Sequence, residues 1–451
     1  MKRFRYPGYS CAMCFCAVSL LMKPVAGFAA DSAPGTSTTG VPMVQGSTSA
    51  GAGLTLEQTV RTALENHSSV KSAAFQTKAQ DAFLHQQMAA YYPSVSLNNT
   101  YRTNNTGGRS ANASQAFDSL SSVANLSMTL YNFGKREGNV QSARDTLEAT
   151  QQSFNATANN VVLAAKQAYY GVLQANALLN VNEETVKDRE ATLKQTQSFY
   201  DVGTRPRSDV TQAEANLYLA QANFIAAKNG VEVAWANLRN AMGVDEFAKQ
   251  PLAEELATAP LPMSLDEAKQ AAFAARPELL QFDALLKAQD QQIAVARRNH
   301  LPDLLFNSSY GRQNSHSEIF PLLPTWQVQL SFNIPIFNGF QTTYQVQQGL
   351  ENYGSIKEQQ RLQKQQVAFQ VEQNYLNLMA AQDVVRANEA AVRAAKQNLD
   401  LHEARYQVGF APIVEVTTAQ TTYTTAQTGY VNAVISYKLS QAQLLNAIGR
   451  Q

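Results

Sequence analysis

Apolar residues recur every seven positions over long stretches of this chain. One line runs from Ala165 to Tyr200 and another from Val371 to Tyr406, and neither is interrupted. A seam of apolar and small residues follows each line, over 210–241 and 416–447. Sustained heptads are typical of helices that pack as coiled coils. We therefore predict long helices over about 135–200, 206–242, 341–406 and 412–448.

Between the long helices the hydrophobic period changes to two. In the clearest segment Trp326, Val328, Leu330 and Phe332 alternate with amide and hydroxyl residues. No Asp, Glu, Lys or Arg occurs anywhere from 319 to 350. Weaker alternation of the same kind occupies 95–101, 124–130 and 304–310. An alternation of this kind predicts strands with one apolar and one polar face.

These strands have two possible surroundings. A soluble sheet with one buried face is one, but such a sheet normally carries charged residues on its wet face. Transmembrane strands of about 9–11 residues, apolar outside and polar inside, fit the uncharged segments better. We therefore predict membrane β-hairpins over about 94–132 and 303–337, with Trp326, Val328, Leu330 and Phe332 facing lipid.

The chain contains one structural unit twice. Thr55-Leu56-Glu57 aligns with Ser264-Leu265-Asp266 at an offset of 209, and the turn at Tyr200 aligns with that at Tyr406 at an offset of 206. We place the two repeats at 54–243 and 263–451, joined by a linker over 244–262. Ahead of each hairpin, the pattern predicts helices over Leu56–Asn66 and Val70–Tyr91, then Leu265–Ala275 and Leu279–His300.

The N-terminus has the features of a secretory signal peptide over 1–30. Basic Lys2, Arg3 and Arg5 precede an apolar run and then small residues. All three cysteines lie in this segment, so the mature chain would have no thiol chemistry. A Gly-, Ser- and Thr-rich stretch over 31–53 is expected to be a disordered leader.

The charge balance excludes one class of partner. Four of the 36 basic residues and none of the 35 acidic residues lie in 1–30, which leaves 32 basic against 35 acidic residues, a net charge of −3. This near-neutral balance gives no electrostatic footprint for nucleic acid. We also expect an oligomer, because four strands cannot close a barrel and lipid forbids an open sheet edge. Three copies would supply about 12 strands.

The order of elements, given twice, resembles the TolC-type outer-membrane efflux proteins. The most specific segments are the paired turns Tyr200-Asp-Val-Gly-Thr-Arg-Pro and Tyr406-Gln-Val-Gly-Phe-Ala-Pro, followed by Tyr131-Asn-Phe-Gly and Phe337-Asn-Gly. The resemblance implies a mostly α fold with a membrane β-barrel part. It implies a homotrimer with a 12-stranded barrel in outer-membrane lipid and a 12-helix tunnel in the periplasm. The implied partners are a periplasmic adaptor and a proton-driven or ATP-driven inner-membrane transporter.

The resemblance also implies a gate at the tunnel tip. By position, Asp209 and Tyr406 match an acid–tyrosine pair that ties neighbouring hairpins, and Glu415 matches one member of an acidic ring. The second acidic position is Thr418 here, and the usual arginine is Ala411. The closed-state network must therefore be built differently, with Arg205 or Arg207 as candidates.

Plainer roles exist for the same residues. Asp209 lies in the first turn of a predicted helix, where a carboxylate is favoured by the helix dipole alone. Tyr406 lies on the heptad line and can be a core residue. At the two turns Gly203, Arg205, Arg207, Gly409 and Phe410 are candidates for adaptor contact or for a solvated turn.

No catalytic, cofactor or metal site is expected. The five histidines are scattered without metal-ligand spacing, and no nucleotide-binding motif occurs. The sequence therefore predicts a passive channel rather than an enzyme. A periplasmic structural coiled coil explains the heptads but not the uncharged hairpins, and a secreted pore-forming protein is the other alternative.

Overall fold

The computed structural model describes residues 53–105, 116–253, 263–314 and 321–450. All helices and strands belong to one unit, Ala52–Gln451. The predicted signal peptide and all but the last residue of the predicted leader lie outside the described residues, as do residues 254–262 of the linker. The fold is mostly helical with one small antiparallel sheet, which confirms the predicted fold class.

The first repeat begins with two helices and a hairpin. They are α1 (Leu56–Asn66), α2 (Ser68–Met88), the short 3₁₀ helix η1 (Ala89–Tyr91), β1 (Ser94–Asn105) and β2 (Ala116–Tyr131). The long helices α3 (Lys135–Asp201) and α4 (Arg207–Met242) follow. The second repeat runs through α5 (Leu265–Ala275), α6 (Pro277–Arg298), β3 (Asp303–Gln313), β4 (Leu323–Asn333), α7 (Gln341–Gln407) and α8 (Ile413–Ala447).

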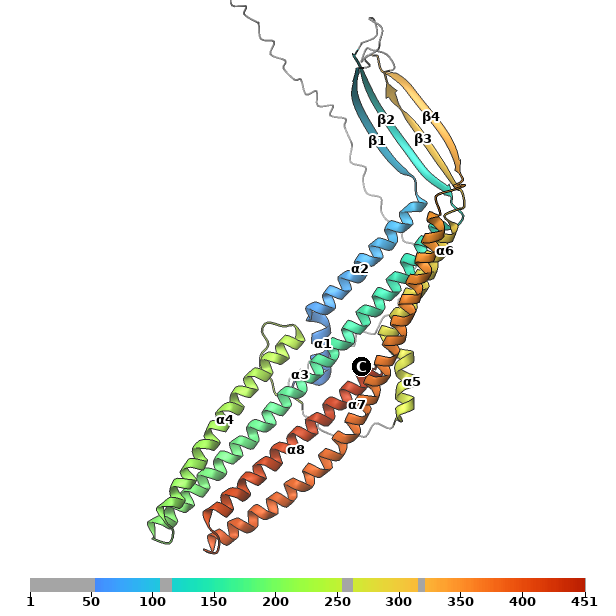
Figure 1. Cartoon of the computed structure of the whole chain (residues 1–451). Coiled ribbons are helices and arrows are strands. Elements are labelled where there is room, and N and C mark those ends of the chain that lie inside the picture. The colour runs from blue at the N-terminus through green and yellow to red at the C-terminus, as the bar shows by residue number, and fades with distance from the viewer. Residues whose placement is uncertain (1–52, 106–115, 254–262, 315–320, 451) are drawn as a thin grey trace, which may run out of the picture. The chain divides into compact units, whose positions relative to one another are not determined.

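The helices lie in rows that continue from one repeat into the other (Figure 1). Next to the strands the order is α2, α3, α6, α7, and toward the turns it is α4, α3, α8, α7. The short helices α1 and α5 pack on α3 and α7 respectively. The long helix α3 therefore contacts the second repeat along its length, whereas α7 lies at the edge of both rows.

An apolar core lies in each repeat where the short helix meets the long ones, and the core of the first repeat also includes Ile435 of α8. In the first repeat Tyr169, Val172, Trp235 and Leu238 are buried together. In the second, the core includes Ala268, Val371, Tyr437 and Leu444. The two long helices of a repeat meet through the predicted heptad residues, since Val210, Ala213, Leu217 and Ala220 are all buried on α4.

The four strands form one antiparallel sheet in the order β1-β2-β3-β4. The two predicted hairpins are therefore joined by pairing of β2 with β3, a contact that the sequence pattern did not specify. The register places Tyr310 opposite Trp326, and Phe306 opposite Leu330, on the same face. Asn307 and Gln329 are paired on the other face. The predicted alternation of apolar and polar faces is thus present in the sheet.

Side chains at the start of α3 fix the strands to the helices. Lys135 donates to the carboxylate of Asp303 and to the carbonyl of Leu301, each at 2.9 Å. The guanidinium of Arg136 donates to the carbonyl of Thr129 and lies 4.1 Å from the centre of the Tyr91 ring. No helix in the described ranges is both long enough and apolar enough to cross a membrane.

Candidate functional site

The candidate site lies at the two turns that join the long helices. In each turn a glycine has positive φ, 77° at Gly203 and 85° at Gly409, which ends the preceding helix. Pro206 and Pro412 then cap the next helix; they precede its first residue, whereas the sequence pattern put them at that residue. Phe410 is 80% exposed at the second turn, and Arg207 is exposed at the first.

Tyr406 is buried at the junction of the two turns. Its side chain is 1% exposed and packs with Ile413 and Val416 of α8. Its hydroxyl lies 3.2 Å from Thr196 Oγ1 on α3, and its ring packs edge-on against Phe199 at 5.7 Å. The residue therefore belongs to the core and also connects the two repeats.

Arg205 links the first turn to the second. Its guanidinium donates to the carbonyl of Ala411 at 2.9 Å and lies 4.8 Å from the centre of the Tyr406 ring. Arg205 and Ala411 occupy equivalent positions in the two repeats, 206 residues apart. Arg205 thus bonds the backbone at the position where the resemblance implied an arginine, and its part in a gate stays a prediction.

Asp209 and Glu415 also occupy equivalent positions but have different contacts. Glu415 Oε2 lies 3.0 Å from His402 Nδ1 and 3.4 Å from Arg405 Nη1, which ties the start of α8 to the end of α7. Asp209 accepts a long hydrogen bond of 3.4 Å from the neighbouring Ser208. Within the described part of one chain no hydrogen bond joins Asp209 to Tyr406, whose side chain contacts Thr196 and Arg205 instead, so the acid–tyrosine pair stays a prediction. Thr418 is exposed on α8.

A polar network joins α3 and α8 near the turns, and no sequence pattern predicted it. Arg189 on α3 is 7% exposed, and its guanidinium donates to Gln420 and, at 3.0 Å, to Thr421 on α8. Gln420 in turn donates to Thr192 at 2.8 Å. The sequence gives one sign of this network when the repeats are compared, because the position equivalent to Arg189 is Ala395.

Burial changes the acid–base properties of this network. It lowers the pKa of Arg189, while the neighbouring carboxylate of Asp188 acts in the opposite direction. Burial also raises the pKa of Asp188, and the positive charge of Lys396 on α7 opposes that rise. The long helices therefore contain partly buried charges close to the turns, rather than a purely apolar seam.

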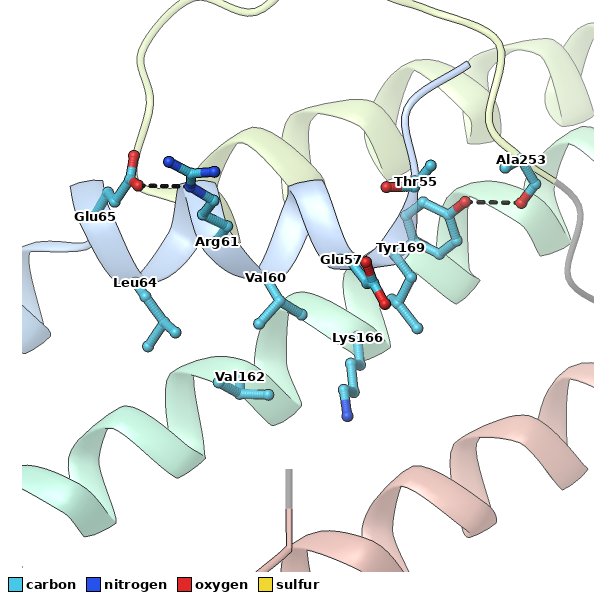
Figure 2. A pocket seen from close by; sticks show the side chains of 11 residues that line it. Thr55, Glu57, Val60, Arg61, Leu64, Glu65, Val162, Lys166, Tyr169 and Ala253 are labelled. Carbon is cyan, nitrogen blue, oxygen red and sulfur yellow. Dashed lines mark hydrogen bonds and ion pairs between the residues drawn. The ribbon is translucent and has the colours of Figure 1, made fainter. Parts of the chain in front are cut away.

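A cavity of about 790 Å³ lies between α1, α3 and Ala253 (Figure 2). Val60, Leu64 and Val162 give it an apolar wall, and Lys166 also lines it. Burial lowers the pKa of Lys166. In the second repeat the residue equivalent to Lys166 is Glu372, which pairs with Lys269 at 2.8 Å. The same position therefore lines a cavity in the first repeat and forms an ion pair in the second.

The four residues predicted to face lipid share one exposed face of the sheet. Trp326, Val328, Leu330 and Phe332 are each at least 59% exposed. That this face meets lipid stays a prediction. No cluster of three or more His, Cys, Asp or Glu residues that could hold a metal occurs among the described residues.

Comparison with known proteins agrees with this architecture. Residues 59–244 and 268–450 match the outer membrane efflux protein family, one match for each repeat. Outer membrane protein TolC of Escherichia coli K12 is 27% identical over 403 residues, which cover 86% of this chain and 80% of TolC.

Solved structures show the same fold. A membrane protein from Pseudomonas aeruginosa has a TM-score of 0.78 at 19% identity, with 88% of this chain and 90% of that chain covered. The outer membrane protein VceC of Vibrio cholerae has a TM-score of 0.75 at 18% identity, with 88% and 96% covered. Because the matched segments span more than half of its length and follow both repeats, this chain belongs to the outer membrane efflux protein family and is a protein of the outer membrane.

Proposed function

We propose that three copies of this chain form a passive exit channel that crosses the outer membrane and extends into the periplasm. Members of the family are outer-membrane channels of efflux and type I secretion systems. The channel receives its cargo from an inner-membrane transporter, driven by protons or by ATP, through a periplasmic adaptor protein. The cargo is small molecules or polypeptides, and the partners select it.

The observation that carries this proposal is the difference in exposure between equivalent positions of the two repeats. Tyr406 is 1% exposed, but the equivalent Tyr200 is 39% exposed. Ala284 on α6, a helix that packs on α3 and α7, is 1% exposed, but the equivalent Phe75 on α2 is 67% exposed. The faces that are covered inside one chain are therefore open at its edge, where the next copy would cover them.

The equivalence of the two repeats also predicts which helices of neighbouring copies meet in the ring. Inside the chain, α3 of the first repeat contacts α6 and α8 of the second. The equivalent contact would place α7 of one copy against α2 and α4 of the next. Repetition of one head-to-tail contact produces a closed ring when the rotation closes. The edge strands β1 and β4 would meet at the same boundary, which supports closure of the sheet in lipid.

The two turns would then surround the periplasmic end of the tunnel. Tyr406 and Arg205 join the two turns inside each chain, and Glu415 ties α8 to α7. We assign Asp209 and Thr418 to contacts with groups outside the chain. We assign Gly203, Arg207, Gly409 and Phe410 to the surface that meets the adaptor. Exposure of Phe410 beside a tight turn supports this assignment, since a large exposed apolar side chain is favoured at binding surfaces.

Mass and conductance measurements on the mature protein test the proposal. Light scattering in detergent should give a particle with three chains, and the same particle should conduct ions in a planar bilayer. A water-soluble monomer would refute the proposal and favour a periplasmic coiled coil. Lysis of cells by the purified protein would favour a secreted pore-forming protein instead.

A further inference from the structure

The charged residues of α4 gather on one side of the helix, which we call the covered side. Beyond its first turn α4 has four of them. Each lies on a line of residues spaced by seven, from 214 to 235, or four residues after a member of that line: Glu214, Lys228, Glu232 and Arg239. Other parts of the chain cover this side. Trp235 is 3% exposed and packs with Leu54 and Leu252, and Glu232 pairs with Lys249.

The opposite side of α4, which we call the bare side, is uncharged. Residues two positions apart in a helix point in nearly opposite directions, so the line two residues further on lies there. Its members are Asn216, Asn223, Gly230 and Asn237, of which the last three are exposed. The equivalent line on α8 is Thr422, Gly429, Ser436 and Gln443. Helix α8 has no charged residue at all from Val416 to Tyr437.

Two cavities on the bare side extend this uncharged surface to α3. One, of about 400 Å³, lies between α3 and α4 and is lined in part by Gly230 and Asn237. The other, of about 480 Å³, also reaches α8 and is lined in part by Asn223 and Thr425. Every residue that lines either cavity is uncharged. By contrast, a third cavity between α3 and α4 has charged lining residues: Glu190, Lys194 and Glu214.

The short helices and the linker indicate which side faces the passage of the proposed ring. Twelve long helices about 10 Å apart would leave an opening roughly 30 Å wide. Helix α1 and the linker pack on the covered side, around Trp235. If α1 and its equivalent α5 lay inside the ring in all three copies, helices about 10 Å thick would fill most of that opening. The covered side therefore faces outward, and the bare side faces the passage.

The resemblance agrees with this orientation. It assigns Glu415 to an acidic ring that lines the constriction, and Glu415 lies seven residues before Thr422. The uncharged line of α8 therefore continues from the one position that the resemblance places against the passage. The equivalent line of α4 continues from Asp209 in the same way.

We infer that the tunnel wall formed by α4 and α8 is uncharged, so that this length of the passage admits cargo of either charge. The inference rests on the proposed function, and it concerns the wall rather than the turns. A charged wall would attract ions of one sign and repel the other over a screening length of about 10 Å at 0.1 M salt. Amide and hydroxyl side chains form hydrogen bonds with water or cargo without such selection.

Variants that change one charge on either side test the inference. Asn223→Asp adds a carboxylate to the bare side and keeps the shape of the side chain. Glu232→Gln removes a carboxylate from the covered side in the same way. Thr425→Asp is a second wall variant, on α8. Each full-length channel would be reconstituted in a planar bilayer, and the reversal potential in a KCl gradient would give the ratio of K⁺ to Cl⁻ permeability.

We expect Asn223→Asp and Thr425→Asp to raise this ratio by about twofold or more at 0.1 M salt, and by less at 1 M, where the screening length is about 3 Å. Glu232→Gln should leave the ratio unchanged. The inference would be overturned by an unchanged ratio in both wall variants. A fall of the ratio in Glu232→Gln would also overturn it, because the covered side would then face the passage. A parent protein that forms no trimer or conducts no ions would instead refute the proposed function, and with it the ring on which the inference rests.

Discussion

Glu415 and Asp209 are equivalent carboxylates in two copies of one turn, yet only Glu415 is tied to the preceding helix. Its partners His402 and Arg405 both lie on the last two turns of α7. The Glu415 side chain therefore stabilises the turn as well as the start of α8, where the helix dipole also favours a carboxylate. A change at Glu415 would therefore affect the α7–α8 turn as well as any gate.

We predict that Glu415→Gln alters single-channel conductance or cation block in planar bilayers. The amide keeps the shape of the side chain but removes the charge that holds His402 and Arg405. Asp209→Asn is the matched control at the equivalent position, and it should have a smaller effect because Asp209 has no such ion pair among the described contacts. Unchanged conductance in Glu415→Gln would remove this residue from the gate.

We predict that Asp188→Asn changes how stability depends on pH. Burial raises the pKa of Asp188 in the folded protein. The protonated Asp188 carboxyl therefore adds to the stability of the folded protein. This contribution is fully present below the pKa that Asp188 has in the unfolded chain, and it is lost as pH rises through the pKa of the folded state. The amide cannot lose a proton, so the variant should avoid this loss.

Thermal unfolding at acidic and at neutral pH checks this prediction. The difference in midpoint between parent and Asp188→Asn should shift in favour of the variant as pH rises. Asp383→Asn is the control, since Asp383 has an 80% exposed side chain on α7. An equal pH effect in both variants would show that burial at Asp188 is not the cause.

At the scale of elements, the turns are set by backbone conformation more than by side-chain contacts. Gly409 has φ of 85°, and a Cβ added there would meet no atom within 4 Å. A substitution at Gly409 therefore probes the left-handed conformation alone, without steric conflict. Gly171 is a useful contrast, because it lies inside α3 and also has open space around its Cα.

We predict that Gly409→Ala destabilises the α7–α8 hairpin by about 1–2 kcal/mol, since an L residue is strained in the left-handed region. Gly171→Ala should instead stabilise α3 by about 0.5–1 kcal/mol, because glycine is unfavourable inside a helix. Circular dichroism during thermal unfolding in detergent measures both. Similar effects of the same sign would show that the turn does not depend on this conformation.

At the scale of the whole molecule, the sheet is the part of the chain that we predict to face lipid. Its apolar face is exposed on the single chain, and its polar face carries Asn307 paired with Gln329. Neither face meets a helical layer in Figure 1, so the apolar face requires another apolar environment. The outer membrane supplies that environment for members of this family.

We predict that Leu330→Arg weakens insertion into lipid vesicles by about 2–4 kcal/mol if Leu330 lies near the bilayer midplane. Gln329→Arg, on the opposite face of the same strand, is the matched control and should have a much smaller effect. Urea titration of vesicle-bound protein measures the free energy of folding in lipid. A larger loss for Gln329→Arg would reverse the assignment of the two faces.

The sequence alone determined the periodic parts of this protein. Heptads over 165–200 and 371–406 and the alternation over 326–332 are local patterns, and each dictates a helix or strand together with its apolar face. The internal offset of 206 indicated a duplicated architecture, and the paired turns indicated the family. The heptads, the alternation and the turns were predictable because each depends on residues that are close in the chain, and the duplication was visible because two segments of one sequence can be compared directly.

Only the tertiary structure decided which faces of the two repeats meet. Pairing of β2 with β3, and the bonds from Arg189 to Gln420 and from Arg205 to Ala411, join residues about 200 positions apart. No periodicity encodes such contacts, because they depend on how α3 packs against α8 after both helices have formed. The second repeat has Ala395 at the position equivalent to Arg189. The packing of α3 against α8 explains this difference, because it buries the Arg189 guanidinium among hydroxyl and amide groups.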